Sequence, residues 1–199
     1  MRRRSADSIP RNMRLLIYGA KDFAQTAAEL AVHCGHAVAG FIDDFERSPR
    51  IVGSFDDVTR TTAPTDAGIV LAVGYRDLAG RWTALQRVRA AGFTLPALVH
   101  PRAYVADSAR LGEGCMVMAG AIVDVRASLG DGVVLWPGAC VNHDSVVGDN
   151  TFVSPNATIC GHVRIGAHCF IGAGAAIADH RTVPDRSFVR MLTAYVERD

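Results

Sequence analysis

His143 and Asp144 are the residues whose types are best suited to chemistry. They stand side by side in the segment VNHDSVVGDN, which runs from Val141 to Asn150. An imidazole takes up and releases protons near neutral pH, and a neighbouring carboxylate can support its charged form. The pair therefore raises the question of what it does in a segment where ordinary turn residues would serve.

The segment belongs to a ladder in which every sixth residue is aliphatic, from Val105 to Val189. A small residue stands two places before almost every rung, as at Ala109 and Cys115. Helical faces recur near 3.6 residues and strand faces at 2, so neither explains this period. A triangular β-solenoid does, because each hexapeptide supplies one flat side and one corner around a narrow core. His143 then lies at a corner outside the core, and the fold does not require it.

Two further expectations follow from the small-residue position of the ladder. Cys115 and Cys169 occupy it, which favours core packing over a nucleophilic role. Arg181 also falls on it, so we expect the regular prism to end near Ile177. The five cysteines are odd in number and form no C-x-x-C pair, which argues against a disulfide framework or a zinc ribbon and fits a reducing cytoplasm.

Residues 14–99 alternate between apolar strand patterns and helical patterns, which predicts a small parallel α/β domain of the nucleotide-binding kind. Of a G-x-G-x-x-G fingerprint only Gly19 remains, after the first strand. Asp43 and Asp44 follow the second strand and Gly74 follows the third. Because ligands of such folds bind beyond the carboxyl ends of the strands, these residues are candidates for one binding crevice. Ordinary turn and capping roles are the alternative.

Composition excludes several classes of function. The formal net charge is +1, which gives no basic surface for nucleic acid. No apolar run reaches the length of about 18 residues that a membrane span needs.

From the patterns above we predict a Rossmann-like α/β domain over 13–99 and a parallel β-helix over 100–190, with a flexible tail at 1–12 and a second tail at 191–199.

An α/β domain, a His100-Pro101 junction and a hexapeptide solenoid together resemble the NeuD/PglD-like family of bacterial sugar N- and O-acetyltransferases. The resemblance implies a left-handed β-helix, acetyl-CoA bound to the solenoid, and a nucleotide-linked amino sugar bound to the first domain. It also implies a homotrimer with active sites between neighbouring solenoids. The main expectation is transfer of an acetyl group from acetyl-CoA to the sugar amine.

The resemblance also assigns roles in the solenoid. His143 matches the general base of the family, with Asp144 supporting its imidazolium form. Gly161 and Ala173 match positions where the backbone contacts coenzyme A, and a backbone N–H there would polarise the thioester oxygen.

In the first domain the resemblance assigns substrate binding. Asp43 and Asp44 match the acids that read the uracil and ribose of the nucleotide-linked sugar, while Gly19 and Gly74 line the same cleft.

The sequence departs from the family pattern around the acceptor. Lys21 to Gln25 replace the flexible, histidine-bearing part of the first loop, and Trp136 and Phe152 stand where relatives carry Asn and His. Since both aromatic residues are close to His143 in sequence, we expect them to line an acceptor pocket beside the base and to favour a more apolar acceptor.

Three other functions remain open. The first is O-acetylation of a sialic-acid-like or non-sugar acceptor, and the second is a non-catalytic nucleotide-binding trimer. The third is a metal enzyme, since His162 and His180 are separated by one coil and should stack. With His168 one side round the prism, these histidines do not converge on one ion, so we expect no metal.

Overall fold

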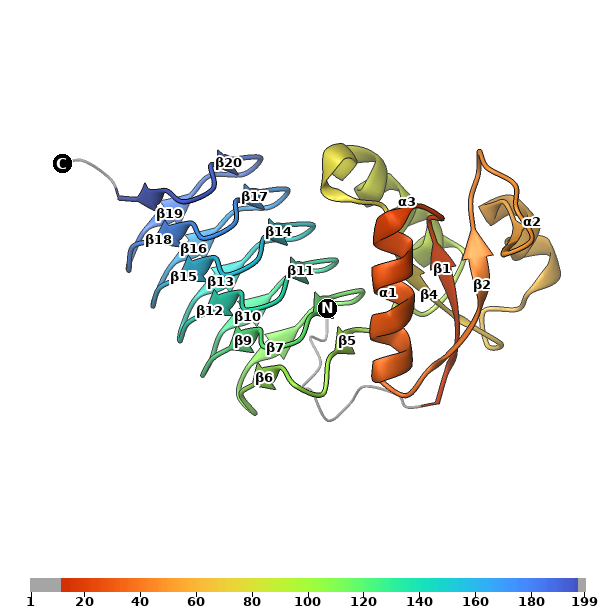
Figure 1. Ribbon diagram of the computed structural model, residues 1–199, viewed down its shortest axis with the longest axis horizontal. Helices are drawn as coiled ribbons and strands as arrows, with labels where there is room; N and C mark the ends of the chain where they lie inside the picture. The colour runs from red at the N-terminus through yellow and green to blue at the C-terminus, as the bar shows by residue number, and fades with distance from the viewer. Residues whose placement is uncertain (1–11, 197–199) are drawn as a thin grey trace. The chain divides into compact units, whose positions relative to one another are not determined.

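The computed structural model describes residues 12–196 and divides the chain into two compact units, with the division between Leu98 and Val99 (Figure 1). The first eleven residues of the predicted N-terminal tail lie outside the described part. Among the helices of the described residues, none is long and apolar enough to cross a membrane.

The first unit is built on a parallel four-stranded sheet with the order β3-β2-β1-β4. Its strands are β1 (Arg14–Tyr18), β2 (Ala37–Ile42), β3 (Ile51–Gly53) and β4 (Gly68–Leu71). Its helices are α1 (Asp22–His33), α2 (Phe55–Thr61) and α3 (Leu78–Ala90), with the 3-10 turn η2 (Tyr75–Asp77) before α3. Because all four strands are parallel, the residues after β1, β2 and β4 lie at one edge of the sheet.

Both faces of this sheet are covered. Alternation along β1 sends Leu16 into a cluster with residues of α2 and α3, such as Val58 and Leu85. Leu15 and Ile17 point to the other face, and α1 packs against β1 and β2. All of these β1 side chains are almost completely buried. This packing on both faces holds the carboxyl ends of the strands in place, and the candidate crevice lies at those ends.

The elements β3 and α2 are missing from the sequence prediction. The strand has only three residues, too few to show a period. The helix did carry a signal: Ser54 and Asp57 form a capping box, in which each side chain accepts a hydrogen bond from the other's backbone N–H. These two elements place the N-terminus of α2 beside the loop after β2, as described below.

The second unit is a parallel β-solenoid of the left-handed β-helix type, whose two-residue strands form three sides. The β7 side contains β7 (Arg110–Leu111), β10 (Ser128–Leu129), β13 (Val146–Val147), β16 (Arg164–Ile165) and β19 (Thr182–Val183). The β5 side contains β5 (Leu98–Val99), β8 (Met116–Val117), β11 (Val134–Leu135), β14 (Phe152–Val153), β17 (Phe170–Ile171) and β20 (Phe188–Val189). The β6 side contains β6 (Tyr104–Val105), β9 (Ile122–Val123), β12 (Cys140–Val141), β15 (Thr158–Ile159), β18 (Ala176–Ile177) and β21 (Ala194–Tyr195).

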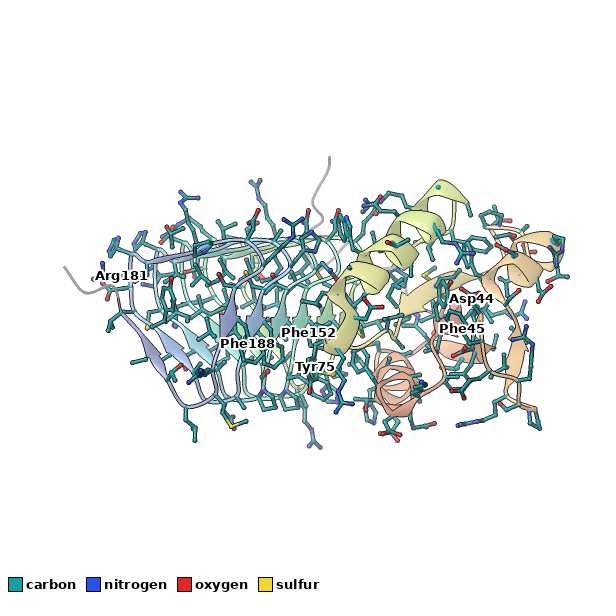
Figure 2. The ribbon with its side chains drawn as sticks, turned by 90° about the horizontal axis from the view of Figure 1, so that it is seen from above. Asp44, Phe45, Tyr75, Phe152, Arg181 and Phe188 are labelled. Atoms are coloured by element: carbon teal, nitrogen blue, oxygen red, sulfur yellow. The ribbon has the colours of Figure 1, made fainter. Side chains whose placement is uncertain are left out.

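The predicted ladder fills the interior of this solenoid. The aliphatic rungs are buried on all three sides from Leu111 to Val189, and Cys115 and Cys169 are completely buried, as expected of core residues. Phe152 and Phe188 are the outward members of their strands on the β5 side (Figure 2), but Phe152 is only 1% exposed, whereas Phe188 is 69% exposed.

The expectation that the prism ends near Ile177 is wrong. Strand β19 pairs in register with β16, and the rung Val183 is fully buried against Ile165. The Arg164 N–H donates to the Arg181 carbonyl oxygen at 2.9 Å, so the ladder at this position is made by backbone groups. A large side chain at 181 does not remove these groups, and the solenoid continues through β21, which the sequence prediction had placed in a C-terminal tail.

The corners of the solenoid share one backbone conformation. From Gly114 to Leu192 every sixth residue has a positive φ, and Gly, Asn, Asp and His occupy most of these positions. These are the residue types that tolerate the left-handed region best. Asp144, His162 and His180 all lie at such positions, so corner geometry by itself accounts for their residue types, but not for His143.

Candidate active site

His143 lies in the corner between β12 and β13, where the β6 side turns into the β7 side; we call residues 142–145 and those one coil above and below them the His143 corner. The imidazole is about half exposed, with 49% of the side chain accessible. Its Nδ1 lies 3.0 Å from Oδ2 of Asp144. The structure thus brings the predicted base and its predicted acid into hydrogen-bond contact.

Asp144 is held from the coil below by Arg126, a residue that the sequence analysis does not identify. Arg126 Nε donates to Oδ1 at 2.7 Å and Nη2 donates to Oδ2 at 2.8 Å. These hydrogen bonds from Arg126, followed by that from His143, keep the pKa of Asp144 far below its ordinary value. The carboxylate therefore stays ionised wherever the imidazole titrates.

Gly161 lies one coil above His143 and makes room for its ring. A Cβ atom at position 161 would lie 2.7 Å from Cε1 and 2.8 Å from Nε2 of His143, closer than real carbon atoms approach. The imidazole therefore lies against the Gly161 backbone. Within the described part of the chain, neither His143 Nε2 nor the Gly161 N–H makes a hydrogen bond. A free ring nitrogen thus stands beside a free backbone donor.

Two further histidines continue the His143 corner upward. The His162 ring meets the His143 ring edge to face with centroids 5.2 Å apart, and His180 stacks on His162 at 4.6 Å. The predicted stacking of His162 and His180 is confirmed. His168 lies at a different corner, where its Nδ1 is 2.9 Å from the Asn150 amide nitrogen.

One group near His143 has the residue types of a metal site. His143, Asp144 and His162 each offer a ligand atom, and these atoms lie within 4.8 Å of one another. This group is not among the predicted sites, where His162 is grouped only with His180 and His168. However, the Arg126 guanidinium already contacts both oxygens of Asp144. A cation would have to share that carboxylate with a second positive charge, so the group suits an ion pair better than a metal.

The α/β unit carries the predicted crevice residues at the edge where its strands end. Gly19 has a φ of 126°, and a Cβ there would lie 2.8 Å from the Ala72 carbonyl oxygen. Glycine is therefore required where the chain leaving β1 passes the end of β4. Gly74 has open space around it and extended backbone angles, so nothing in the structure demands glycine at that position.

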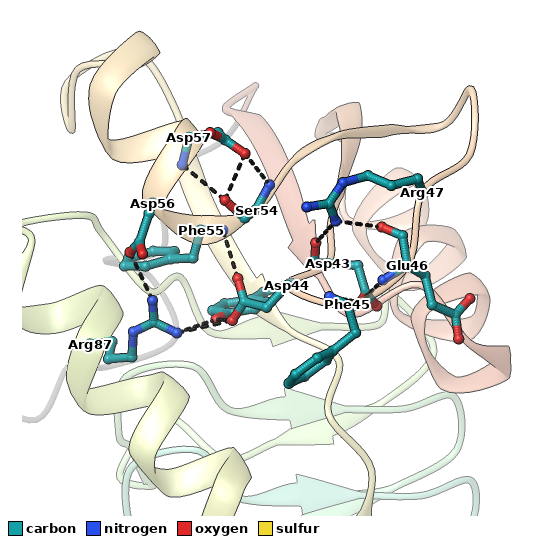
Figure 3. A network of polar contacts seen from close by, with 11 residues as sticks. Asp43, Asp44, Phe45, Glu46, Arg47, Ser54, Phe55, Asp56, Asp57 and Arg87 are labelled. Atoms are coloured by element: carbon teal, nitrogen blue, oxygen red, sulfur yellow. Dashed lines mark hydrogen bonds and ion pairs between the residues drawn. The ribbon is translucent and has the colours of Figure 1, made fainter.

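Asp43 and Asp44 are both engaged by neighbouring groups of the chain (Figure 3). Oδ1 of Asp43 accepts hydrogen bonds from the backbone N–H groups of Phe45 and Glu46, at 2.9 and 3.0 Å. Asp43 thereby closes the turn after β2. The Phe45 ring itself is 93% exposed.

Asp44 joins several elements through a network that the sequence analysis does not predict. It accepts hydrogen bonds from the Tyr18 hydroxyl at 2.5 Å, from the Phe55 N–H at 2.8 Å and from Arg87 at 2.9 Å. Partial burial opposes ionisation of Asp44, but these donors outweigh it and lower its pKa. Arg87 also pairs with Asp56 at 2.9 Å and lies over the Phe55 ring. Both oxygens of Asp44 are therefore used in holding α2 and α3 to the sheet.

Comparison with known proteins identifies the family that has this architecture. The family model described as bacterial transferase hexapeptide (six repeats) matches residues 126–161 and 144–179. The structure is similar to the acetyltransferase domain of PglB from Neisseria gonorrhoeae FA1090, with 31% identity, a TM-score of 0.86, and coverage of 93% of this chain and 92% of that one. The chain belongs to the NeuD/PglD-like family of sugar acetyltransferases. A search of curated proteins found no match.

Members of the NeuD/PglD-like family have been solved with ligands. The PglB domain with acetyl coenzyme A matches at 31% identity and a TM-score of 0.87, covering 93% of this chain and 91% of that chain. Perosamine N-acetyltransferase from Caulobacter crescentus, solved with CoA and GDP-perosamine, matches at 27% identity and a TM-score of 0.75, covering 96% of this chain and 100% of that chain. One of these relatives thus holds acetyl coenzyme A, and the other holds CoA together with a nucleotide-linked amino sugar.

The expectation that Trp136 and Phe152 lie beside His143 of the same chain is wrong. Phe152 belongs to the β5 side, whereas the His143 corner joins the other two sides. In a three-sided prism a corner faces away from the opposite side, so Phe152 lies across the coil from the base. Trp136 follows β11, at the corner between the β5 and β6 sides. Residues close to His143 in sequence need not lie close to it in space, because each hexapeptide turns the chain by a third of a coil.

The two predicted coenzyme positions also lie at different corners of one chain. Gly161 belongs to the His143 corner, whereas Ala173 lies between β17 and β18, at the corner that also carries Trp136. Within one chain Ala173, Trp136 and Phe152 all lie away from the His143 corner, and their ligand-binding roles stay predictions.

We expect chelation to leave acetyl transfer unchanged, because Arg126 already neutralises the carboxylate that a metal would need. The measurement is the rate of CoA release before and after dialysis against EDTA, with a mock-dialysed sample as control. A loss of rate that zinc ions restore would contradict this expectation and support the group of His143, Asp144 and His162 as a metal centre.

Proposed function

We propose that this protein transfers the acetyl group of acetyl-CoA to the amine of a nucleotide-linked amino sugar, with His143 as general base. The observation that carries the proposal is the arrangement at the His143 corner. An imidazole is held through Nδ1 by an ionised carboxylate, while its Nε2 stands free beside an unpaired backbone N–H. The relatives that bind acetyl-CoA and a nucleotide-linked amino sugar support the choice of substrates.

In the proposed reaction the amine nitrogen attacks the thioester carbonyl carbon while His143 Nε2 accepts the amine proton. Asp144 stabilises the imidazolium that forms. The free N–H of Gly161 donates to the oxyanion of the tetrahedral intermediate. The carbon–sulfur bond then breaks, and the CoA sulfur leaves with the proton returned by the imidazolium. Gly161 would thus have two roles: its predicted contact with the coenzyme, and donation of its N–H to the oxyanion.

We further propose that the α/β unit is Rossmann-like and holds the nucleotide at the edge where Gly19, Asp43, Asp44 and Gly74 gather. The strand order and the open space at Gly74 support this role. Since the oxygens of Asp44 are already bonded within the chain and Asp43 is buried, both would shape the crevice, and the exposed Phe45 is better placed to meet a ligand.

A homotrimer completes the proposed site. Ala173 and Trp136 lie away from His143 in one chain, and a neighbouring solenoid would bring them to it. Phe152 is only 1% exposed, so it is the least suited of the three predicted residues to meet a ligand. The five cysteines of the described chain are present as thiols, which supports a reducing, cytoplasmic location. Light scattering should report a mass of three chains, and a monomer at working concentration would contradict the shared site.

The function is tested by measuring thiol release from acetyl-CoA with a panel of nucleotide-linked amino sugars, followed by mass spectrometry of the product. We expect one acetyl group on the sugar nitrogen of at least one member of the panel. Acetylation of a hydroxyl would favour the O-acetyltransferase alternative. No thiol release with any amine or hydroxyl acceptor, despite nucleotide binding, would favour a non-catalytic nucleotide-binding trimer.

A further inference from the structure

Arg126 occupies a special position relative to the proposed base. It precedes Asp144 by 18 residues, one complete coil, and reaches up the His143 corner to bind both oxygens of the carboxylate. Its backbone N–H is fixed in turn by Ser108 Oγ at 3.0 Å. The Arg126 side chain is 63% exposed. Exposed ion pairs add little to the stability of the fold. The main effect of the two-point contact is therefore to fix the position and orientation of the Asp144 carboxylate.

The carboxylate of Asp144 has two imidazoles within reach. His143 Nδ1 is 3.0 Å from Oδ2, and His162 Nε2 is 3.9 Å from the same oxygen. A carboxylate held only by its own side-chain torsions would be shared between these two rings. The Arg126 fork fixes the plane of the carboxylate and presents Oδ2 to His143.

The orientation of Asp144 decides which ring nitrogen of His143 carries the proton. A carboxylate at Nδ1 requires the N–H to be there, which leaves Nε2 as the lone-pair nitrogen beside Gly161. If the carboxylate turned toward His162, neutral His143 would also populate the opposite tautomer. Its Nε2 would then carry a hydrogen and could not accept a proton from the amine.

We propose that Arg126 is a positioning residue, which locks Asp144 so that His143 is kept in the tautomer that leaves Nε2 free to act as base. This inference rests on the proposed function, in which His143 accepts the amine proton. The guanidinium also offsets part of the negative charge that Asp144 and nearby Asp124 place at the corner. His162 lies directly above His143 at this corner, and His180 with its neighbour Asp179 lies one coil higher.

The test compares Arg126→Gln with Arg186→Gln. Both arginines occupy left-handed corner positions, with φ of 57° and 60°, but Arg186 lies at a different corner from His143. We expect Arg126→Gln to lower kcat by about 10- to 100-fold, as loss of an orienting partner commonly does, with KM for acetyl-CoA unchanged. Arg186→Gln should behave as the wild type. Arg126→Lys keeps the charge without the two-point contact and should recover only part of the lost rate.

The pH profile provides a second readout. Removing the guanidinium leaves the Asp144 carboxylate uncompensated beside His143, which favours the protonated ring. The acidic limb of the kcat profile should therefore move to higher pH in Arg126→Gln and stay in place in Arg126→Lys. A merely structural role would lower the rate in both variants without this difference.

The third readout does not depend on activity. Nitrogen-15 NMR of the imidazoles should show the Nδ1–H tautomer for His143 in the wild type and Arg186→Gln, and a mixture of tautomers in Arg126→Gln. Unchanged tautomers and an unchanged kcat in Arg126→Gln would overturn the role of Arg126. If no acceptor is acetylated even by the wild type, the proposed function fails, and the NMR comparison still decides whether Arg126 positions the ring.

Discussion

Replacing His143 with alanine is expected to lower kcat by about 10²- to 10⁴-fold, the usual cost of removing a general base. The imidazole lies outside the prism and fills no part of the core, so its loss should leave the fold, the assembly and coenzyme binding intact. Steady-state kinetics gives the rate, while calorimetry with CoA and light scattering report binding and assembly.

His180→Ala is the matched control, because His180 lies at the same corner but contacts His162 and not Asp144. It should retain nearly all activity. Full activity of His143→Ala would rule out His143 as the base, and unfolding would make it a structural residue.

Replacing Gly161 with alanine is expected to lower kcat by about 10²-fold, because a displacement of about 1 Å in a reacting group can cost that much. The new methyl group would collide with Cε1 and Nε2 of His143, and the ring is the part free to move. Gly161 does not need a left-handed backbone, so the variant should fold and melt like the wild type.

A double-mutant cycle separates displacement of the ring from other effects of the methyl group. If Gly161→Ala acts only by moving His143, the double variant Gly161→Ala/His143→Ala should be as fast as His143→Ala alone. If the two losses multiply instead, Gly161 acts without the imidazole, through the oxyanion or the coenzyme. A raised KM for acetyl-CoA would identify the coenzyme contact.

The solenoid could be predicted from the sequence because its core residues repeat at a strict interval of six. Each aliphatic rung faces the interior, so the side-chain pattern reports the fold directly. The pair of His143 and Asp144 was likewise visible, since adjacent residues at a corner meet without help from the rest of the chain.

Other parts of the site depend on neighbours one coil away, and these were missed. Arg126 with Asp144, and His143 with Gly161, become neighbours only once a coil has closed. The prediction for the aromatic residues was wrong for the opposite reason. Phe152 is close to His143 in sequence, yet the chain turns between them, so they lie on different parts of the prism. The hydrogen bonds of Asp44 were hidden because they join Tyr18, Phe55 and Arg87 from three distant segments.

The stacking of corner residues at intervals of one coil limits how the chain can gain or lose residues. An insertion of 18 residues above the last contact of the His143 corner would add a coil and leave every vertical neighbour in place. A single added hexapeptide between Arg126 and Asp144 would move the arginine to another corner and break the two-point contact, although the core would still be filled. Length variation near the site should therefore come in whole coils, while insertions of one or two hexapeptides would keep the fold and abolish the arrangement around the base.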